Sequence, residues 1–349
     1  MKAAILEGAR EIHCAEAAAP ELSSGQVLVR TAAAGICGTD LHIYRGEFGE
    51  RVRFPAILGH EFGGEIVDVG ASVEGWRVGD RVAADPIVSC HGCPPCREGH
   101  INACRTLKLL GVDMAGGYGE VVAVPKENLY RLPDSVPMHH APMVEMYGLG
   151  HHILRRGRVD LGESVVIIGA GRLGLSVLDV LCHGSGAAEA MVVDIAPFRL
   201  ATARKLGAQH CCDATKTDPV DFVLEQTDGV GADCVIECVG HYHELPDREA
   251  PLAQAVQMIR NGGRIVTAGL GEQPSSVHFK TLVLKEAEII ASRVTAGEFS
   301  RALYLMGKGL LHPELLITHQ RPIEQVAEAF ATIDTEAPEV IKIVLAMGA

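Results

Sequence analysis

Three residues of types that bind zinc occur close together near the start of the chain. Cys37 lies in the segment ICGTDLH (36–42), and His60 and Glu61 lie in GHEFGG (59–64). A structural zinc site uses four protein ligands, whereas a catalytic site keeps one position open for water or substrate. A thiolate, an imidazole and a carboxylate together therefore predict catalytic zinc.

Two further groups beside Cys37 suit proton transfer, the Thr39 hydroxyl and the His42 imidazole. Other interpretations exist for each residue taken singly, since a lone cysteine is commonly a small buried hydrophobe and Thr39 could belong to a helix N-cap. The local composition favours the metal. Four glycines surround His60 in a segment that otherwise alternates like a strand, which indicates close backbone approach or positive φ: Gly59, Gly63, Gly64 and Gly70.

A second group of cysteines has the spacing of a structural zinc site. The pattern is Cys-x2-Cys-x2-Cys-x7-Cys, with glycines and prolines in between: Cys90, Cys93, Cys96 and Cys104. Two-residue spacers let consecutive thiolates converge on one ion, and four thiolates leave no position for a substrate. We therefore predict a closed zinc site here.

Two other interpretations of these four cysteines agree less well with the sequence. A disulfide pair needs an oxidising compartment, but we recognise no signal peptide and expect a cytoplasmic protein. A zinc ribbon that contacts nucleic acid needs clustered Lys and Arg, but the formal net charge is −13. We expect the other six cysteines to be reduced packing residues: Cys14, Cys182, Cys211, Cys212, Cys234 and Cys238.

A glycine-rich turn in the second half of the chain predicts a dinucleotide site. The apolar run VVII (165–168) leads into GAGRLG (169–174), and a helical pattern follows. In this strand–turn–helix context the glycines let the backbone approach a pyrophosphate, and the helix N-terminus supplies amide donors. The alternative is a glycine-rich turn in an α/β domain that binds nothing. The predicted cofactor contacts are Gly169, Gly171, Arg172, Leu173 and Gly174.

Asp194 ends the next predicted strand, about 20 residues beyond Gly174, where a carboxylate accepts hydrogen bonds from the adenosine ribose. The same charge repels a 2′-phosphate, so the sequence favours NAD over NADP. Arg199 is a basic group that could serve such a phosphate, but more often it packs over the adenine. We include both residues in the predicted cofactor site.

The elements that must position these residues are of two types. The first half has short strands separated by turn residues, as at 27–30, 65–69, 81–83 and 118–124, which is typical of a small β-barrel-like domain. From about residue 153, strands alternate with helical patterns, which predicts βαβ units on a parallel sheet. The candidate strands of that sheet are 164–168, 190–193, 234–237, 263–268 and 288–292.

The length of 349 residues suits two domains rather than one compact core. The hydrophobic fraction is 48%, but we find no apolar run long enough to span a membrane and expect no membrane partner. After about Gly297 the sequence carries an amphipathic helix and a final strand at 340–345. The overall fold class that we predict is α/β.

The sequence resembles a known family. The pattern Gly-His-Glu-x2-Gly-x5-Gly over 59–70 matches the zinc signature of the zinc-dependent medium-chain dehydrogenase/reductases, the alcohol dehydrogenase superfamily. The resemblance covers nearly the whole chain and implies a GroES-like, β-barrel-type catalytic domain joined to a doubly wound, parallel-sheet Rossmann domain. It also implies that the tail folds back, so that 1–152 and 297–349 form the catalytic domain and 153–296 the NAD-binding domain.

The resemblance assigns roles to single residues. Thr39 stands where the family's hydroxyl takes the alcohol proton, and His42 matches the outer proton acceptor. Glu145 stands where alcohol dehydrogenases carry a second cysteine ligand and where polyol (sorbitol-type) dehydrogenases carry a glutamate, which they use directly or through water. Met146 departs from the family pattern, which has proline after that glutamate.

An open zinc site and a nicotinamide cofactor in one chain imply interconversion of an alcohol and a carbonyl compound by hydride transfer. The leading hypothesis is a dehydrogenase of a polyol, sugar alcohol or related secondary alcohol, with one catalytic and one structural zinc. The second is an L-threonine 3-dehydrogenase-like activity, because residues 37–44 and 110–113 also resemble that branch.

A hypothesis from another class is a catalytically inactive zinc- and NAD-binding protein with a structural or sensing role. The intact set of zinc-binding and proton-transfer residues opposes it. We expect a small-molecule alcohol or ketone as the substrate, no nucleic-acid partner, and a homo-oligomer, either a tetramer or a dimer.

Overall fold

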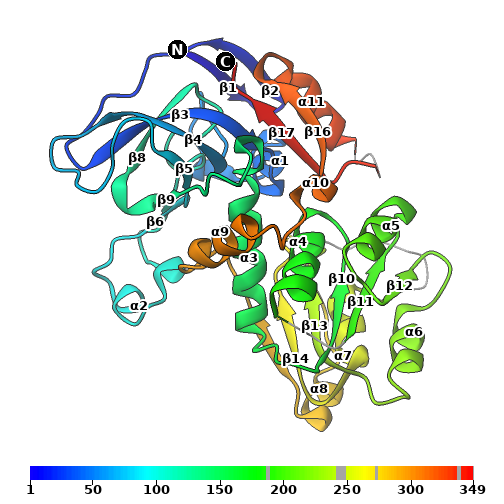
Figure 1. Ribbon diagram of the computed structural model, residues 1–349. Coiled ribbons are helices and arrows are strands. Elements are labelled where there is room, and N and C mark those ends of the chain that lie inside the picture. Colours follow the sequence, from blue (N-terminus) through cyan, green and yellow to red (C-terminus); the bar gives the residue numbers. More distant parts are fainter. Residues whose placement is uncertain (186–188, 241–248, 272–273, 336–338, 349) are drawn as a thin grey trace. The chain divides into compact units, whose positions relative to one another are not determined.

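The computed structural model describes residues 1–185, 189–240, 249–271, 274–335 and 339–348. The chain forms two compact units (Figure 1). Unit 1 comprises Met1–Gly148, Thr295–Gly309 and Ile317–Ala349, and unit 2 comprises Leu149–Val294 and Leu310–Leu316. The chain therefore enters unit 2 twice and returns to unit 1 each time.

Unit 1 contains a seven-stranded sheet in the order β16-β17-β3-β4-β5-β9, with β8 also paired to β3, and two small sheets, β1-β2 and β6-β7. The final strand β17 pairs antiparallel with β3, so the C-terminal segment lies beside the strand that leads to Cys37. The strands are β1 (Lys2–Gly8), β2 (Glu11–Glu16), β3 (Gln26–Gly35), β4 (Glu61–Val69), β5 (Arg81–Ala84), β6 (Ile87–Val88), β7 (Lys108–Leu109), β8 (Val121–Pro125), β9 (Leu129–Arg131), β16 (Ile317–Pro322) and β17 (Lys342–Ala346).

Strands β3 and β4 approach each other so closely that one position admits only glycine. A Cβ atom on Gly64 would lie 1.9 Å from the carbonyl oxygen of Arg30. The register sets Gly35, the last residue of β3, opposite Glu61, the first residue of β4. This pairing brings the segment that contains Cys37 next to the segment that contains His60.

Helices fill the connections of unit 1. Phe330 of α11 contacts Tyr44 of α1 and Tyr118, with ring centroids 5.0 and 6.1 Å apart, and all three rings are buried. These contacts hold α1, which carries Thr39 and His42. The helices that begin in unit 1 are α1 (Gly38–Tyr44), α2 (Pro94–Arg97), α3 (Met143–Arg156), α9 (Phe299–Gly307), α11 (Val326–Asp334) and the 3-10 turns η1 (Gly49–Arg51), η2 (Ile101–Ala103), η3 (Lys126–Asn128), η4 (Met138–His140) and η6 (Ile323–Gln325).

Unit 2 is a six-stranded parallel sheet in the order β12-β11-β10-β13-β14-β15. Figure 1 shows helices along both sides of this sheet. Its elements are β10 (Ser164–Ile168), β11 (Glu189–Asp194), β12 (His210–Asp213), β13 (Ala232–Glu237), β14 (Ile259–Thr267), β15 (Glu288–Ala291), α4 (Arg172–Val180), the π-helical turn η5 (Leu181–Ser185), α5 (Pro197–Lys205), α6 (Pro219–Gln226), α7 (Pro251–Met258), α8 (Phe279–Lys285) and α10 (Pro313–Leu316).

The parallel sheet and its position in the chain confirm the sequence prediction, since each of the five predicted strands overlaps an observed one. The central strands β10 and β13 are buried along most of their length, which explains the apolar runs VVII in β10 and CVI in β13. The prediction missed β12. Its sequence, HCCD, contains none of the residue types that are enriched in strands (Val, Ile, Thr, Tyr, Phe or Trp) and is too short to show a periodic pattern.

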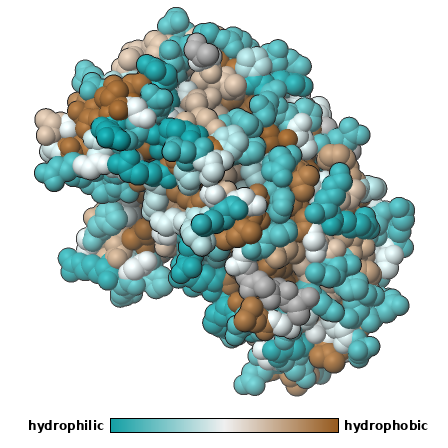
Figure 2. Space-filling model, in the orientation of Figure 1, coloured by the Kyte–Doolittle hydropathy of each residue, from teal (hydrophilic) through white to brown (hydrophobic). Residues whose placement is uncertain are grey.

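Among the described residues, every helix is too short or too polar to be a candidate membrane span. On the face shown in Figure 2, hydrophobic residues reach the surface in several separate places among hydrophilic ones. Exposed large hydrophobic side chains are concentrated on α8, where Phe279, Val283 and Leu284 are each at least 70% exposed. This helix precedes β15, the edge strand of the parallel sheet.

Candidate active site

Cys37, His60 and Glu61 offer ligand atoms that lie within 4.8 Å of one another in unit 1. Cys37 is the N-cap of α1, directly after β3, and its backbone N–H donates to the Asp40 carboxylate at 2.8 Å. His60 and Glu61 lie where β4 begins, opposite the end of β3. The geometry therefore brings together three of the residues that the sequence predicted as metal ligands.

Asp40 orients the His60 imidazole. Its side chain is completely buried, its Oδ1 lies 3.5 Å from His60 Nδ1, and its Oδ2 accepts a hydrogen bond from the Tyr118 hydroxyl at 3.0 Å. A carboxylate on one ring nitrogen fixes the ring and leaves the other nitrogen for a metal. Sequence analysis did not identify Asp40 or Tyr118 as part of the site.

The electrostatics of this pair favour charge separation. Burial acts to raise the pKa of Asp40, but His60 and hydrogen bonds from Cys37 and Tyr118 hold that pKa below its usual value. Burial acts to lower the pKa of His60, but Asp40 and the Cys37 sulfur raise it well above 6.5. The cluster therefore attracts positive charge, either as a proton on His60 or as a cation beside it.

Glu61 forms a buried ion pair with Lys342 of β17, and both side chains have no exposed surface. The Lys342 ammonium donates to Glu61 Oε2 and to the Ile36 carbonyl, the latter at 3.2 Å. Gly35 makes room for this pair, because a Cβ atom there would lie 2.4 Å from Glu61 Oε2 and 2.7 Å from Lys342 Cε. Lys342 thus balances the negative charge of Glu61 next to the cluster.

The cluster fits a zinc ion. Thiolate sulfur, imidazole nitrogen and carboxylate oxygen are the donors that zinc binds. The buried Oε1 of Glu61 has no hydrogen-bond partner among the described residues. Asp40 Oδ1 and His60 Nδ1 also lack a hydrogen bond, but they face each other 3.5 Å apart as an ion pair. Buried polar atoms normally have partners, so the remaining oxygen of Glu61 suits an ion at the cluster.

Glu145 lies close enough to the cluster to interact with it electrostatically, although it is not among the donor atoms within 4.8 Å of one another. It is on the first turn of α3 and is 5% exposed. Burial and the negative charge of Glu61 raise its pKa to about 7, while His60 and Lys342 act in the opposite direction. Glu145 therefore faces the site that the sequence assigned to it, without a contact that defines it as a ligand.

Thr39 and His42 are three residues apart on α1, a spacing that places side chains on one helix face. Thr39 is half-buried. The His42 side chain is 28% exposed, and its Nδ1 pairs with the Glu47 carboxylate. Within the described residues no hydrogen bond joins Thr39 to His42. The helix therefore carries a hydroxyl near the cluster's cysteine and an imidazole that reaches solvent.

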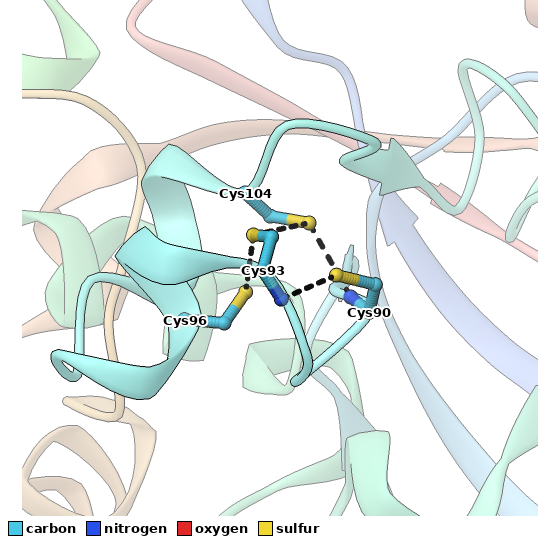
Figure 3. A group of neighbouring side chains, drawn as sticks. All are labelled: Cys90, Cys93, Cys96 and Cys104. Carbon is cyan, nitrogen blue, oxygen red and sulfur yellow. Dashed lines mark hydrogen bonds between the residues drawn. The ribbon is translucent and has the colours of Figure 1, made fainter.

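The four-cysteine group forms a lobe on the β6–β7 pair. The four sulfur atoms lie within 4.8 Å of one another, and Figure 3 shows the side chains turning these atoms toward a common centre. The Cys93 sulfur is 3.4 Å from that of Cys96 and 4.0 Å from that of Cys104. Sulfur atoms around a tetrahedral zinc ion are separated by about 3.8 Å. The lobe is therefore shaped for a closed four-thiolate site.

The thiols of this lobe differ in acidity. N–H donors of Gly92 and Cys93 lower the pKa of Cys90 to about 6, whereas burial raises the pKa of Cys96 to about 12. Four thiolates close together repel one another, so the fully ionised state needs a cation at the centre. A divalent metal would supply it, because metal binding releases the thiol protons.

The glycine turn of unit 2 has the geometry that a dinucleotide needs. Gly169 has φ +97°, and a Cβ atom on Gly174 would lie 1.8 Å from the Gly169 carbonyl oxygen. Gly171 caps α4, and a Cβ atom there would meet nothing within 4 Å. The first and third glycines are thus required by the turn itself, and the second leaves space for a ligand. Arg172 and Leu173 are the first two residues of α4.

Asp194 lies at the end of β11, beside this turn. Its Oδ2 accepts the Ala170 N–H at 2.6 Å, and its Oδ1 accepts the Ala196 N–H at 2.8 Å. A carboxylate can accept further bonds on its remaining lone pairs. Arg199, on α5, has a buried Nε atom without a hydrogen-bond partner in the described part of the chain. Both residues are available to a nucleotide, although no contact joins them to each other.

Two family models match the sequence, "Alcohol dehydrogenase GroES-like domain" over residues 23–134 and "Zinc-binding dehydrogenase" over residues 173–308. Starvation-sensing protein RspB of Escherichia coli (strain K12) is 34% identical over 345 residues, which is 99% of each chain. This protein is a zinc-type medium-chain dehydrogenase. The family and the fold predicted from the sequence, a GroES-like domain joined to a Rossmann domain, are confirmed.

The relatives of this dehydrogenase are named as dehydrogenases of different substrates. A crystal structure of the rspB alcohol dehydrogenase from E. coli CFT073, complexed with NADH, matches 99% of both chains at 34% identity with a TM-score of 0.91. Sorbitol dehydrogenase of Bacillus subtilis is 32% identical over 94% of this chain and 92% of its own. L-Threonine 3-dehydrogenase of Bacillus velezensis is 34% identical over 89% of each chain.

Three residues of the dehydrogenase site escaped sequence analysis: Asp40, Tyr118 and Lys342. Asp40 lies in the segment 36–42 but was assigned no part in the site, and Tyr118 was predicted only as the first residue of the strand 118–124. No sequence pattern pointed to Lys342, because a lysine in a C-terminal strand is ordinarily interpreted as an exposed residue of an edge strand. The role of Lys342 depends on the pairing of β17 with β3, and no local sequence pattern predicts that pairing.

Proposed function

We propose that this dehydrogenase is a zinc- and NAD-dependent oxidoreductase that interconverts a secondary alcohol (a polyol, sugar alcohol or related compound) and its ketone. The observation that carries the proposal is the convergence of Cys37, His60 and Glu61, with one buried oxygen of Glu61 that lacks a partner among the described residues, in a chain that also holds an open dinucleotide turn. The similarity to a sorbitol dehydrogenase supports the substrate class.

Zinc held by Cys37 and His60, with Glu61 or Glu145 completing the set, would act as a Lewis acid that lowers the pKa of the substrate hydroxyl, and NAD would accept the hydride. The protein's own residues position these groups. Asp40 holds the His60 ring. Lys342 holds one oxygen of Glu61, so that only the other is free to turn toward the cluster.

In this proposal, two residues of α1 transfer the proton of the substrate. The Thr39 hydroxyl takes the proton of the substrate and passes it to His42. The His42 ring is partly exposed and paired with Glu47, so it can release the proton to solvent. An imidazole suits this step because its ordinary pKa is near neutral.

We propose NAD rather than NADP because the Asp194 carboxylate lies at the end of β11 beside the glycine turn. A negative charge there repels a 2′-phosphate. Comparing the rates with NAD and with NADP tests this choice. A wild-type preference for NADP would overturn the cofactor assignment and leave the reaction class standing.

The finer parts of the proposal concern assembly. We propose a structural zinc in the four-cysteine lobe, a catalytic domain of 1–152 and 297–349, and an NAD-binding domain of 153–296. We also propose a homo-oligomer, supported by the exposed hydrophobic side chains of α8, the helix that precedes the edge strand β15. A group of exposed apolar side chains often marks a protein–protein contact. The cytoplasmic location stays a prediction.

A substrate panel scored by NADH absorbance tests the reaction. We expect turnover with sorbitol, arabitol or 2,3-butanediol in the presence of NAD, and loss of that turnover when zinc is removed. Turnover restricted to L-threonine would favour the second candidate, which the similarity to L-threonine 3-dehydrogenase supports. Tight NAD binding without turnover of any alcohol would favour a sensing role, the role named for RspB.

A further inference from the structure

A third group of metal-binding side chains lies in unit 2, apart from the residues discussed above. Asp179 of α4, His183 of the π-helical turn η5, and His312 just before α10 offer ligand atoms within 4.8 Å of one another. All three belong to the same compact unit, although His312 is far from the other two in sequence.

Both imidazoles already contact the same carboxylate oxygen, and the His183 Nδ1 also lies 3.1 Å from the Asp179 carbonyl oxygen. His183 Nδ1 lies 3.0 Å from Asp179 Oδ1, and His312 Nδ1 lies 2.9 Å from the same oxygen. Ligand atoms around a tetrahedral zinc ion with bonds of about 2.0 Å are separated by about 3.3 Å. A widening of a few tenths of an ångström would therefore admit an ion in place of the two Nδ1 protons.

The surroundings preorganise these ligands. The Asp179 side chain is completely buried, and its second oxygen accepts the His312 backbone N–H at 2.7 Å. The two imidazole rings lie side by side with centroids 4.5 Å apart. A buried carboxylate held by a backbone donor is the supporting interaction that metal ligands commonly have.

The site is open to solvent on the side of the histidines. The His183 and His312 side chains are 31% and 34% exposed, so an ion can enter and keep water in its remaining positions. Two imidazoles and one carboxylate suit divalent transition metals such as zinc, whereas calcium and magnesium need more oxygen ligands.

We propose that Asp179, His183 and His312 form a third metal site, which binds a divalent transition-metal ion and ties the segment Leu310–Leu316 to the end of α4. The ion is structural, since it holds together two segments of unit 2. A π-helical turn at His183 is consistent with a local distortion that serves a site.

The test compares zinc content between matched variants of the whole protein. Wild type, His183→Gln, His312→Gln and the control His210→Gln are equilibrated with the same concentration of free Zn²⁺, and bound zinc is counted by mass spectrometry. His210 is a half-buried histidine of β12 in the same unit. We expect wild type and the control to bind one zinc ion per chain more than either cluster variant. Equal zinc content in all four proteins would overturn the proposal.

A second measurement separates a metal site from a purely hydrogen-bonded cluster. An ion that binds only the folded state raises the melting temperature. Added Zn²⁺ should therefore raise the melting temperature of wild type and of His210→Gln more than that of His183→Gln or His312→Gln. The same rise in all four would contradict the proposal, and two independent variants guard against misfolding of one. Because the test compares only the differences between variants, its outcome does not depend on the proposed reaction or on zinc ions bound at other sites.

Discussion

The four-cysteine lobe and the Cys37–His60–Glu61 cluster are both metal-type sites of unit 1, but they are assembled in different ways. The lobe takes all of its ligands from one short stretch, Cys90 to Cys104, on the β6–β7 pair. The cluster takes its residues from the end of β3 and the start of β4, and it depends on Lys342 of β17. One site is local in sequence, and the other exists only after the sheet has formed.

This difference agrees with the roles that we propose for the two sites. A local, closed set of thiolates can bind metal as soon as its loop forms, and the binding energy then stabilises that loop. A non-local, open set is held by the fold around it, and its spare position is left for a substrate. Disruption of the lobe should therefore affect stability most, and disruption of the cluster should affect turnover most.

Cys37→Ser should have the largest effect of all on turnover. Loss of the thiolate removes one of the few ligands at the open site, so we expect loss of zinc there and of nearly all activity, while the fold and the lobe zinc remain. Zinc content by mass spectrometry and turnover by NADH absorbance measure both effects. Cys14→Ser, at a half-buried cysteine of β2, is the control and should leave both unchanged. Full zinc occupancy in Cys37→Ser would contradict the assignment of the site.

Cys93→Ser should show the opposite pattern. One thiolate of four is lost, so the ion that organises the lobe is weakened and thermal stability or assembly falls, while molecules that remain folded keep most of their turnover. Melting curves and size-exclusion chromatography follow the change. If stability and assembly are the same as in wild type, the lobe is not held by a metal.

Lys342→Met should reveal how far the cluster depends on the C-terminal strand. The change leaves Glu61 buried without its partner, and breaking a buried ion pair typically costs about 3–5 kcal/mol. Lys2→Met breaks an exposed pair with Glu324, whose charges are screened by solvent, and should cost much less. Denaturant unfolding of both variants gives the comparison. Equal, small losses would mean that Lys342 does not hold the cluster.

The residues of the two sites were predictable from the sequence to different degrees. Local spacing is visible in a sequence, whereas contacts between distant segments are not. Cys90 to Cys104 were found together because their spacing is local. Cys37, His60 and Glu61 were found because each lies in a short motif, but the Glu61–Lys342 pair was not found, since it depends on strand pairing between the two ends of the chain. The Asp179–His312 contact was also missed, because it joins α4 to a segment that is far away in the sequence. The parallel sheet was predictable because buried strands such as β10 have continuous apolar runs.

Asp85→Asn tests a residue at the junction between the central sheet and the lobe. Burial raises the pKa of Asp85 to about 7, and its Oδ1 accepts the Ile87 N–H at the start of β6. Because this pKa is higher in the folded than in the unfolded state, the folded state binds the proton more tightly, and wild type loses stability as the pH rises from about 4 to about 7. The loss is at most about 4 kcal/mol.

The asparagine variant has no such proton to lose, so its free energy of unfolding should fall less than that of wild type between pH 5 and pH 8. Denaturant unfolding at several pH values measures both curves. Asn can still accept the Ile87 N–H, so the variant should fold. If the free energies of unfolding of the two proteins change with pH in parallel, ionisation of Asp85 does not destabilise the fold in this range.

Glu145→Ala tests whether Glu145 binds the metal directly or only lies near the residues that do. If Glu145 acts on the metal through water or through the field of the cluster, its loss should leave zinc partly bound and slow turnover by roughly 10- to 100-fold, as is typical of groups that support metal ligands. Direct ligation predicts the result of Cys37→Ser instead, with zinc and activity lost together. The ratio of zinc content to turnover in the two variants therefore decides the role. Full activity in Glu145→Ala would remove this glutamate from the site and leave Glu61 as the carboxylate that completes it.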